Sequence, residues 1–325
     1  MSETQAPLPM TLEWLNIEFA SRCNLRCKWC SLDFDKPSVN MDEALLGKTL
    51  DELFASPGVT VGEIALHNGG ETLMHPRLGP MLDVIAARRA GRASFPKISL
   101  LTNGVLLNEA KANVILESGA IDLLRVSADG GTVAAFEEMR KPAKWSRVRD
   151  NIHGFVKLNN AAKRRIRTGV ICIIPEDQPC TLDWMEPEFR DVLLAVDNYE
   201  LRYPHNWDGS KDLGLKAAAA TEAVPLQLFR KGKSLLRTAR NIIEQRPAPE
   251  RKVCKFLLRE LVVLPDGRVT VCCADLNARG VIGSLGENSL REIFYSDQRA
   301  AMVEAFRRGD QASIPLCKDC AGYFD

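Results

Sequence analysis

The sequence of 325 residues lacks an excess of charge of either sign, because 43 lysines and arginines against 42 aspartates and glutamates leave a formal net charge of +1. Binding to nucleic acid or to an anionic membrane usually needs a basic surface, so the composition indicates neither partner. The sequence also lacks any apolar run near the ~20 residues of a membrane-spanning helix. Its first ten residues show neither the basic nor the apolar segment of a signal peptide. We therefore expect a cytoplasmic protein.

Cysteine, by contrast, is plentiful and unevenly placed. In the reducing cytoplasm, ten cysteines favour metal or redox chemistry over disulfides. Five of them lie within residues 254–320, and three crowd near the start of the chain as Cys23, Cys27 and Cys30. Cys172 and Cys180 stand apart. Cys172 falls inside a predicted strand, where we expect it to be a small buried side chain.

The first two thirds of the chain alternate between strand-like and helix-like segments. The predicted strands cover residues 11–19, 61–67, 97–102, 121–128, 166–174 and 198–204. The predicted helices between them cover residues 40–54, 76–91, 108–119, 146–163 and 182–196, the first capped by Asn40 and the third by Asn108. Six such units in a row predict an α/β fold, a parallel sheet with helices outside, and fit either a flat doubly wound sheet or a partial barrel. In both cases ligands gather at the carboxyl ends of the strands.

The last third of the chain breaks this pattern. Residues 206–250 predict a linker followed by a basic helix at about 226–246. Residues 258–273 predict a β-hairpin that turns on Pro-Asp-Gly, and residues 289–310 predict a helix. We therefore expect a core domain over residues 11–205 and a small, separately nucleated α+β module of hairpin and helix over residues 251–325.

The three early cysteines have the spacing Cys-x3-Cys-x2-Cys, directly after the first predicted strand. A closed zinc site needs four ligands. Three thiolates can instead hold three irons of a [4Fe–4S] cluster and leave the fourth iron open to a non-protein ligand. A zinc site that borrows a distant fourth ligand is the alternative. With Trp29 before the last cysteine, the segment resembles the signature of the radical S-adenosylmethionine (radical SAM) superfamily.

The resemblance extends over about residues 12–205 and implies a partial (β/α)6 TIM-like barrel. In this family S-adenosylmethionine binds the open iron through its amino and carboxylate groups. Further motifs follow in the expected order: "HNGGETL" at 67–73, "TNG" at 102–104, "VSADGG" at 126–131 and "FEEMRK" at 136–141. The resemblance implies cofactor contacts by Trp29, Gly69, Gly70, Glu71, Asn103, Ser127 and Arg140. Among these, Glu71 would accept from the methionine ammonium and Arg140 would pair with its carboxylate. From the residues alone, Arg140 could equally be a solvated arginine at a helix end.

The C-terminal cysteines resemble those of the twitch module, a shortened SPASM domain of radical SAM enzymes with auxiliary clusters. The resemblance implies one auxiliary [4Fe–4S] cluster, held by Cys254, Cys272, Cys317 and Cys320. Cys272 and Cys273 compete for one ligand place, because neighbours on a strand point to opposite faces. A structural zinc site is the alternative for this set.

The architecture resembles that of aminocyclitol dehydrogenases of aminoglycoside biosynthesis. This implies hydrogen abstraction by a 5′-deoxyadenosyl radical from a sugar- or cyclitol-like small molecule, then oxidation through the auxiliary cluster. It also implies a reductant such as flavodoxin or ferredoxin as a partner. Arg202 and His205, at the C-terminal end of the sixth strand, and Asp275 are candidate catalytic residues. The alternatives are a peptide or protein maturase, a redox-neutral epimerase or decarboxylase in which Cys273 returns a hydrogen atom, and a non-enzymatic iron–sulfur or zinc scaffold.

Overall fold

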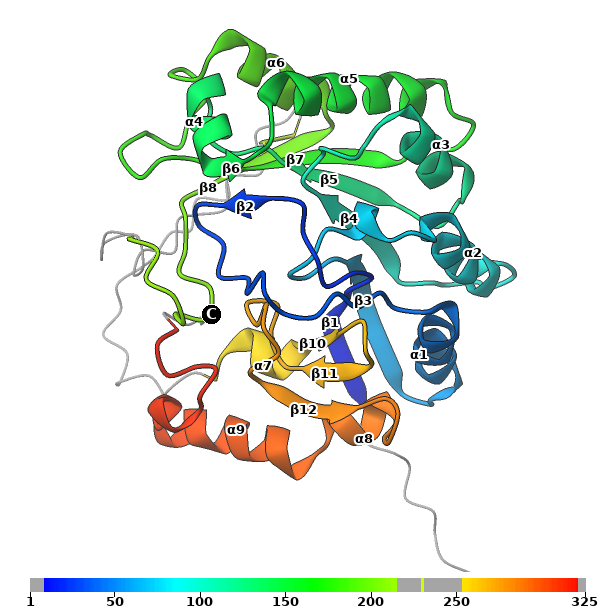
Figure 1. Ribbon diagram of the computed structural model, residues 1–325. Coiled ribbons are helices and arrows are strands. Elements are labelled where there is room, and N and C mark those ends of the chain that lie inside the picture. Colours follow the sequence, from blue (N-terminus) through cyan, green and yellow to red (C-terminus); the bar gives the residue numbers. More distant parts are fainter. Residues whose placement is uncertain (1–8, 215–228, 231–252, 321–325) are drawn as a thin grey trace, which may run out of the picture.

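A computed structural model describes residues 9–214, 229–230 and 253–320 of the chain. In this part of the chain, ten strands form one sheet in the order β12-β11-β10-β1-β3-β4-β5-β7-β8-β9. The middle strands run parallel and in chain order (Figure 1): β1 (Met10–Ile17), β3 (Val59–Leu66), β4 (Lys97–Thr102), β5 (Leu123–Ser127), β7 (Arg167–Ile173) and β8 (Asn198–Arg202). The predicted α/β fold is confirmed. The order ends in two different edge strands, so the sheet is an open, partial barrel.

Helices cover the outer face of this sheet, as Figure 1 shows. They are α1 (Glu43–Ala55), α2 (Leu78–Arg89), α3 (Glu109–Glu117), α5 (Trp145–Ala161) and α6 (Pro187–Ala195). The strand residues that point to them are apolar and almost wholly buried, such as Leu15, Ile64 and Leu100. Cys172 on β7 is one of these buried residues, as expected. The apolar core therefore lies between sheet and helices, and the other face of the sheet is left to polar side chains.

The caps of the helices confirm one prediction and correct another. Asn108 caps α3, with its Oδ1 accepting from Lys111 N at 3.0 Å. For α1 the cap is Asp42 and not Asn40, because Asp42 Oδ1 accepts from Leu45 N at 2.7 Å. Asn40 instead forms a β-bridge with Ala20, at the start of the cysteine loop. Asn40 is therefore part of a bridge to Ala20 and lies before the start of α1.

Several short elements were not predicted from the sequence. They are β2 (Arg26–Cys27), the 3-10 helix η1 (Thr72–Met74), α4 (Val133–Met139) and β6 (Arg140–Lys141). β2 and β6 pair with each other in a second, two-stranded sheet. Both are too short to show a hydrophobic period, so the sequence carries no signal for them.

The C-terminal part of the chain joins the main sheet. The predicted hairpin is present as β10 (Glu260–Val263) and β11 (Arg268–Thr270), and β12 (Val281–Ser284) follows it. β10 also pairs in parallel with β1, so the sheet runs through both parts of the chain. The separately nucleated module that we expected is therefore continuous with the core in its hydrogen bonding.

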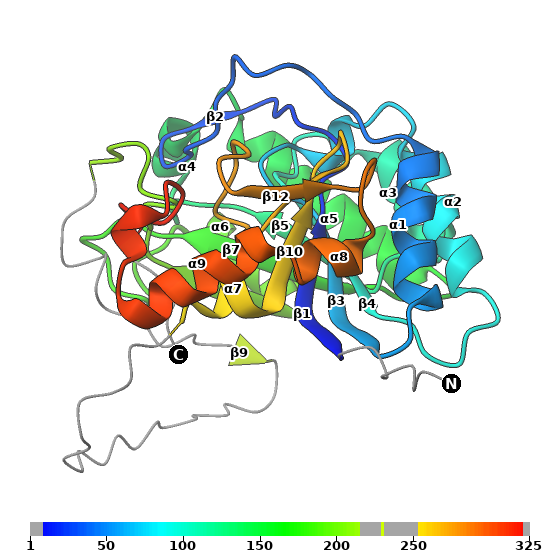
Figure 2. The ribbon, with the colours of Figure 1, turned by 90° about the horizontal axis from the view of Figure 1, so that it is seen from below.

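Helices flank this hairpin on one side, as Figure 2 shows: α7 (Lys255–Arg259), α8 (Leu290–Phe294), α9 (Asp297–Arg308) and the 3-10 helix η3 (Gln311–Ser313). The single helix predicted over residues 289–310 is thus two helices. Tyr295 ends the first helix, and Ser296 caps the second, because its Oγ accepts from Arg299 N. The helix predicted at 226–246 lies outside the described residues except for β9 (Phe229–Arg230), which borders β8.

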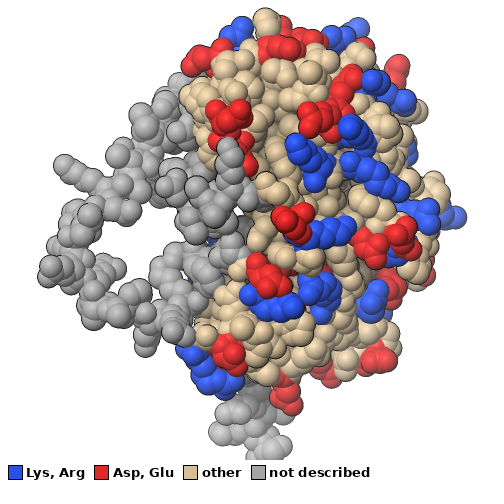
Figure 3. Space-filling model, turned by 60° about the vertical axis from the view of Figure 1, so that its left-hand side comes forward, with Lys and Arg blue, Asp and Glu red and all other residues tan. Residues whose placement is uncertain are grey.

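The face shown in Figure 3 carries acidic and basic side chains interspersed over its described part. None of the helices in the described ranges combines the length and the apolar composition that crossing a bilayer requires.

Candidate functional site

The first cysteine loop leaves β1 and runs along one edge of the sheet, where the parallel strands end (Figure 2). Its three cysteines are half-buried. Cys27 lies in β2 and is paired with Arg140 in β6, although 113 residues separate the two in sequence. This pairing brings the predicted arginine directly against the predicted cluster ligands.

Burial raises the pKa of all three thiols in this loop. The pKa of Cys27 rises to about 12, because burial and the charges of Asp129, Cys30 and Cys23 outweigh the opposing charge of Arg140. The charges of Cys23 and Cys30 act on Cys27, so the three thiols lie near one another. At pH 7 they hold their protons, and ligation needs the positive charge of a metal centre to displace them.

Neither cysteine set forms a site for a single metal ion within the described residues. Within the described ranges, no three histidine, cysteine, aspartate or glutamate side chains converge on one metal-ion position. Zinc holds its ligand atoms at about 2.0–2.3 Å. A [4Fe–4S] cluster instead takes thiolates that are distributed around a cube.

The predicted glycine motif packs directly under the cysteine loop. Glu71 N donates to Arg22 O at 2.8 Å, and Gly70 N donates to Glu18 Oε1 at 2.7 Å. A Cβ on Gly70 would lie 1.7 Å from Ala20 O, so only glycine permits this approach of the two backbones. Glu18 was missed from the sequence. The sequence feature that could have revealed it is an acidic residue at the end of the first predicted strand, on the same face as Asn16.

Glu71 is buried and largely satisfied by the protein itself. Its Oε1 accepts from Thr102 Oγ1 at 2.7 Å and from Leu73 N at 3.0 Å, and its Oε2 accepts from Asn103 N at 2.8 Å. A carboxylate has about four acceptor positions. One position on Oε2 is therefore left for a ligand, and the other contacts tie the glycine motif to the end of β4.

The other residues predicted to touch the cofactor lie around the same loop. Asn103 Nδ2 donates to Asn24 Oδ1 at 2.8 Å and approaches Cys23 Sγ at 3.8 Å. Ser127, the last residue of β5, is half-buried. Lys28 Nζ lies 5.8 Å from the ring centre of Trp29. The backbone oxygen of Trp29 accepts a hydrogen bond from Trp207, which belongs to the loop after β8.

Arg140 is a buried arginine and not the solvated helix-end residue of the alternative interpretation. Its Nη1 donates to Asp129 Oδ2 at 2.6 Å, and Asp129 Oδ1 accepts from Ile173 N at 2.8 Å. Its Nε is buried with no hydrogen-bond partner among the described residues. Such an orphaned donor beside the cysteine loop suits an anionic group, so the residues present fit the carboxylate of S-adenosylmethionine.

The predicted catalytic pair, Arg202 at the end of β8 and His205 just beyond it, lies at the same end of the sheet. Arg202 Nε donates to Glu200 Oε1 on the face of the sheet that the helices do not cover, which we call the concave face. Burial lowers the pKa of His205 to about 4, with a smaller contribution from the charge of Arg202. His205 is therefore neutral at pH 7, and its ring lies 4.7 Å from that of Trp207.

The sequence reasoning missed a polar group on the concave face of the sheet. Glu63 on β3 accepts from Lys97 Nζ at 3.1 Å, from Arg125 Nη2 at 3.0 Å and from Ser99 Oγ. His67, which follows β3, has its pKa lowered to about 4 by burial and by the charge of Arg125. His67 Nδ1 is buried without a partner in the described part of the chain. The sequence signal for this group was the presence of charged residues, such as Glu63 and Arg125, within otherwise apolar strands.

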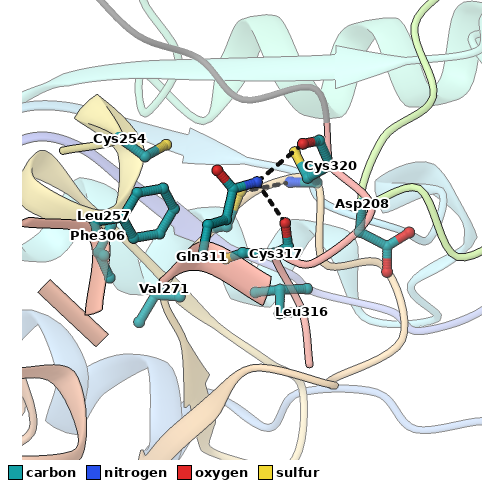
Figure 4. A pocket seen from close by; sticks show the side chains of 11 residues that line it. Asp208, Cys254, Leu257, Val271, Phe306, Gln311, Leu316, Cys317 and Cys320 are labelled. Carbon is teal, nitrogen blue, oxygen red and sulfur yellow. Dashed lines mark hydrogen bonds between the residues drawn. The ribbon is translucent and has the colours of Figure 1, made fainter. Parts of the chain in front are cut away.

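The C-terminal cysteines meet in one pocket (Figure 4). Its lining includes Cys254, Cys272, Cys317 and Cys320 together with Gln311 and Asp208. Burial and the charges of the other three cysteines raise the pKa of Cys317. Four thiols from three separate segments thus share one space, as the ligands of a single cluster must.

Two further contacts shape this pocket. Gln311 Nε2 donates to the backbone oxygens of Cys317 at 2.6 Å and Cys320 at 3.0 Å, which fixes the Cys-x2-Cys turn. Cys273 is not among the residues that line the pocket and lies instead against Glu260, whose pKa burial raises to about 8. Both cysteines lie just after β11, where the chain turns, and Cys272 is the one that lines the pocket.

Asp275, a candidate catalytic residue from the sequence, lies inside the protein in a turn. The residue is fully buried, and its carboxylate accepts from Thr270 Oγ1 at 2.6 Å, Gly280 N at 2.7 Å and Arg279 N at 2.9 Å. The carboxylate of Asp275 thus accepts three hydrogen bonds that stabilise the turn between β11 and β12. The sequence could not distinguish this role, because a turn aspartate and a catalytic one look alike without their partners.

Comparison with family models gives two matches. A model described as the radical SAM superfamily matches residues 17–183, and one described as an iron–sulfur cluster-binding domain, SPASM, matches residues 254–321. The first match implies S-adenosylmethionine and a [4Fe–4S] cluster, and the second implies additional iron–sulfur clusters.

Curated relatives match over part of their length. GTP 3′,8-cyclase of Geobacter sulfurreducens is 30% identical over 190 residues, which are 54% of this chain and 55% of that protein. Molybdenum cofactor biosynthesis protein 1 of Dictyostelium discoideum is 29% identical over 167 residues, which are 50% of this chain and 24% of that protein. The chain thus spans about half or less of the length of these relatives.

Solved structures match over nearly the whole chain. BtrN in complex with AdoMet and 2-DOIA is 19% identical with a TM-score of 0.58, covering 96% of this chain and 94% of its own. Streptococcus suis SuiB bound to the precursor peptide SuiA is 14% identical with a TM-score of 0.66, covering 97% and 72%. anSMEcpe with bound AdoMet is 16% identical with a TM-score of 0.65, covering 96% and 89%. At these identities the likeness is one of fold.

Proposed function

This chain belongs to the radical SAM superfamily, and from that premise we propose that it removes a hydrogen atom from a polar small molecule, a sugar or aminocyclitol, with net oxidation through one auxiliary [4Fe–4S] cluster. We also propose the division into a core over residues 11–205, a linking segment over residues 206–250 and an auxiliary-cluster module over residues 251–325.

In this proposal Cys23, Cys27 and Cys30 hold the first cluster. Their shared electrostatic environment and their place at the carboxyl ends of the strands support this role. Together, the first cluster and S-adenosylmethionine supply a 5′-deoxyadenosyl radical that takes hydrogen from an unactivated carbon. The protein has to bind S-adenosylmethionine and the substrate next to each other and to exclude water.

The cofactor contacts follow from the groups that surround this loop. Arg140 offers its orphaned Nε to the methionine carboxylate, and Glu71 Oε2 offers its remaining acceptor position to the ammonium. Gly69 and Gly70 let the backbone approach closely. Asn103 and Ser127 would bind the ribose, and Trp29 would pack near the adenine. Glu71 therefore acts both as a ligand and as the residue that holds the motif to β4.

The observation that carries the proposal of oxidation is the pocket of Figure 4. Cys254, Cys272, Cys317 and Cys320 all line it, so protein ligands can fill every iron site of an auxiliary cluster. A cluster without an open iron is better suited to accepting an electron than to binding substrate. Such an acceptor has a use when a substrate radical must lose an electron and a proton, and it has none in a redox-neutral reaction.

The polar concave face supports a hydroxylated substrate. Arg125 and Arg202 supply fixed positive charge, and His67 and His205 are neutral rings that can donate or accept hydrogen bonds. The lowered pKa of His67 makes its ring a weak base, so we assign it a hydrogen-bonding role toward a substrate hydroxyl and not the uptake of a proton. A substrate alcohol oxidised here would give its carbon-bound hydrogen atom to the radical, its hydroxyl proton to water, and one electron to an auxiliary cluster held by Cys254, Cys272, Cys317 and Cys320.

The comparisons name other ligands, and the test of substrate class should include them. The anaerobically reconstituted protein is incubated with reductant and S-adenosylmethionine, then with aminocyclitols, sugars, GTP or a peptide library. We expect one aminocyclitol or sugar to stimulate release of 5′-deoxyadenosine and to lose two hydrogens. Stimulation by GTP or peptides alone, or a product that is an isomer of its substrate, would contradict the proposal.

A further inference from the structure

The loop after β8 joins the two cysteine sites. We name residues 205–211 the bridging loop. On one side Trp207 Nε1 donates to Trp29 O at 2.7 Å, next to Cys30, and Lys211 Nζ donates to Leu32 O at 2.7 Å. The bridging loop therefore holds the first cysteine loop at both flanks of its last cysteine.

On its other side the bridging loop holds the C-terminal cysteines. Cys320 Sγ lies 3.5 Å from Trp207 O, and Asn206 Nδ2 donates to Asp319 O at 3.2 Å. Asp208, which lines the pocket of Figure 4, accepts from Arg279 Nη1 at 2.8 Å. Trp207 is thus bound through its indole to the neighbour of one predicted cluster ligand and through its carbonyl to another.

The backbone of Trp207 is in an unusual conformation. Its φ is +55°, in the left-handed region that bulky residues rarely adopt. A residue persists in such a conformation only where its surroundings determine it, and Trp207 has contacts on both sides. Its amide also donates to His205 Nδ1 at 3.1 Å, which ties this geometry to a candidate catalytic residue.

We propose that Trp207 is a positioning residue that couples the two cluster sites, so that a change at the auxiliary cysteines alters the first cluster. Displacement of Cys320 acts on the Trp207 carbonyl, and the strained backbone passes it to the indole and to Trp29. Such a coupling is reciprocal for binding. The proposal rests on the proposed cluster ligands and on no statement about substrate or oxidation.

The two parts of the chain also have contacts that do not involve the bridging loop. Asn277 Nδ2 donates to Ser31 O at 2.8 Å, and Asn277 Oδ1 accepts from Asp33 N at 2.7 Å. Lys36 Nζ donates to Leu276 O at 2.8 Å. A Trp207→Phe variant therefore keeps the two parts docked while it loses the indole donor.

The test measures the midpoint potential of the first cluster without substrate. The first cluster is identified by paramagnetic resonance as the signal that changes when S-adenosylmethionine is added. We expect Cys317→Ala/Cys320→Ala to shift this potential and Trp207→Phe alone to shift it in the same direction. Because both changes act through the same residue, Trp207, the combined variant should shift it no further.

Trp184→Phe is the matched control. Trp184 Nε1 donates to Pro179 O at 2.8 Å, so the variant loses the same kind of hydrogen bond away from both cysteine loops, and its potential should equal that of the wild type. A wild-type potential in Trp207→Phe, or shifts that add in the combined variant, would overturn the proposal. So would an unchanged first-cluster potential in Cys317→Ala/Cys320→Ala, which decides the matter even if Trp207→Phe does not fold.

Discussion

At the scale of single residues, Gly70 marks the place where the glycine motif and the cysteine loop come closest. Replacing it with alanine puts a Cβ 1.7 Å from Ala20 O, so one backbone must move. We expect Gly70→Ala to lower the free energy of unfolding by about 1–3 kcal/mol, the usual cost of overpacking. It should also weaken S-adenosylmethionine binding, measured by calorimetry.

Gly154 provides the matched control for this substitution. It lies within α5, and a Cβ there meets nothing within 4 Å. Gly154→Ala should therefore raise the free energy of unfolding by about 1 kcal/mol, because alanine is the better helix former. Equal effects of the two substitutions in chemical denaturation would contradict the packing described for Gly70.

Two half-buried histidines give the protein a specific pH dependence. His67 and His205 have pKa values lowered to about 4 in the folded chain, against about 6.5 when unfolded. As the pH falls below 6.5 the unfolded chain binds protons that the folded chain refuses, so stability decreases. At pH 5 each histidine accounts for a loss of about 2 kcal/mol relative to pH 8.

Denaturant titrations at pH 8 and pH 5 measure this loss. A His67→Gln/His205→Gln variant should show a smaller decrease in unfolding free energy between the two pH values than the wild type. If wild type and variant decrease equally, the two rings are not buried as neutral groups in the folded protein.

Single residues are also where sequence reasoning was most uneven. It placed Arg140, Glu71 and Asn103 as candidates from motifs, and the structure brings all three to the cysteine loop. It could not foresee that the carboxylate of Asp275 is hydrogen-bonded within a turn, or that His67 Nδ1 has no hydrogen-bond partner among the described residues. Those properties depend on neighbours that lie far away in sequence.

At the scale of elements, the end of β11 decides which of two adjacent cysteines serves the auxiliary pocket. Cys272 lines the pocket, whereas Cys273 lies against Glu260. We expect Cys272→Ala to lose about four of about eight irons, the content of one [4Fe–4S] cluster. Cys273→Ala should keep them all, which makes it the natural control for iron analysis. Loss of iron from Cys273→Ala alone would reverse the assignment.

Strands and helices of the core were predictable because their apolar residues recur with a clear period over seven or more residues, as in β1 and α5. The elements that build the site gave no such signal. β2 and β6 have two residues each, and only their pairing aligns Cys27 with Arg140. The helix predicted over residues 289–310 was broken by a cap at Ser296, which local propensity does not reveal.

At the scale of the whole molecule, the parallel pairing of β10 with β1 places the auxiliary pocket beside the core. Trp14 is paired with Glu260, a contact across most of the chain. The sequence predicted each strand but not their adjacency, because nothing in a single sequence reports such a distant partner. With this pairing and the bridging loop, the two cysteine sites belong to one continuous structure.

The central claim is that the C-terminal cysteines hold an electron acceptor needed for product and not for radical formation. The most direct measurement compares wild type with Cys317→Ala/Cys320→Ala for iron content, 5′-deoxyadenosine and oxidised product under anaerobic reducing conditions. We predict about eight irons for the wild type and about four for the variant. The variant should still release 5′-deoxyadenosine but form no oxidised product. Oxidised product at the wild-type rate from a variant with about four irons would contradict the account.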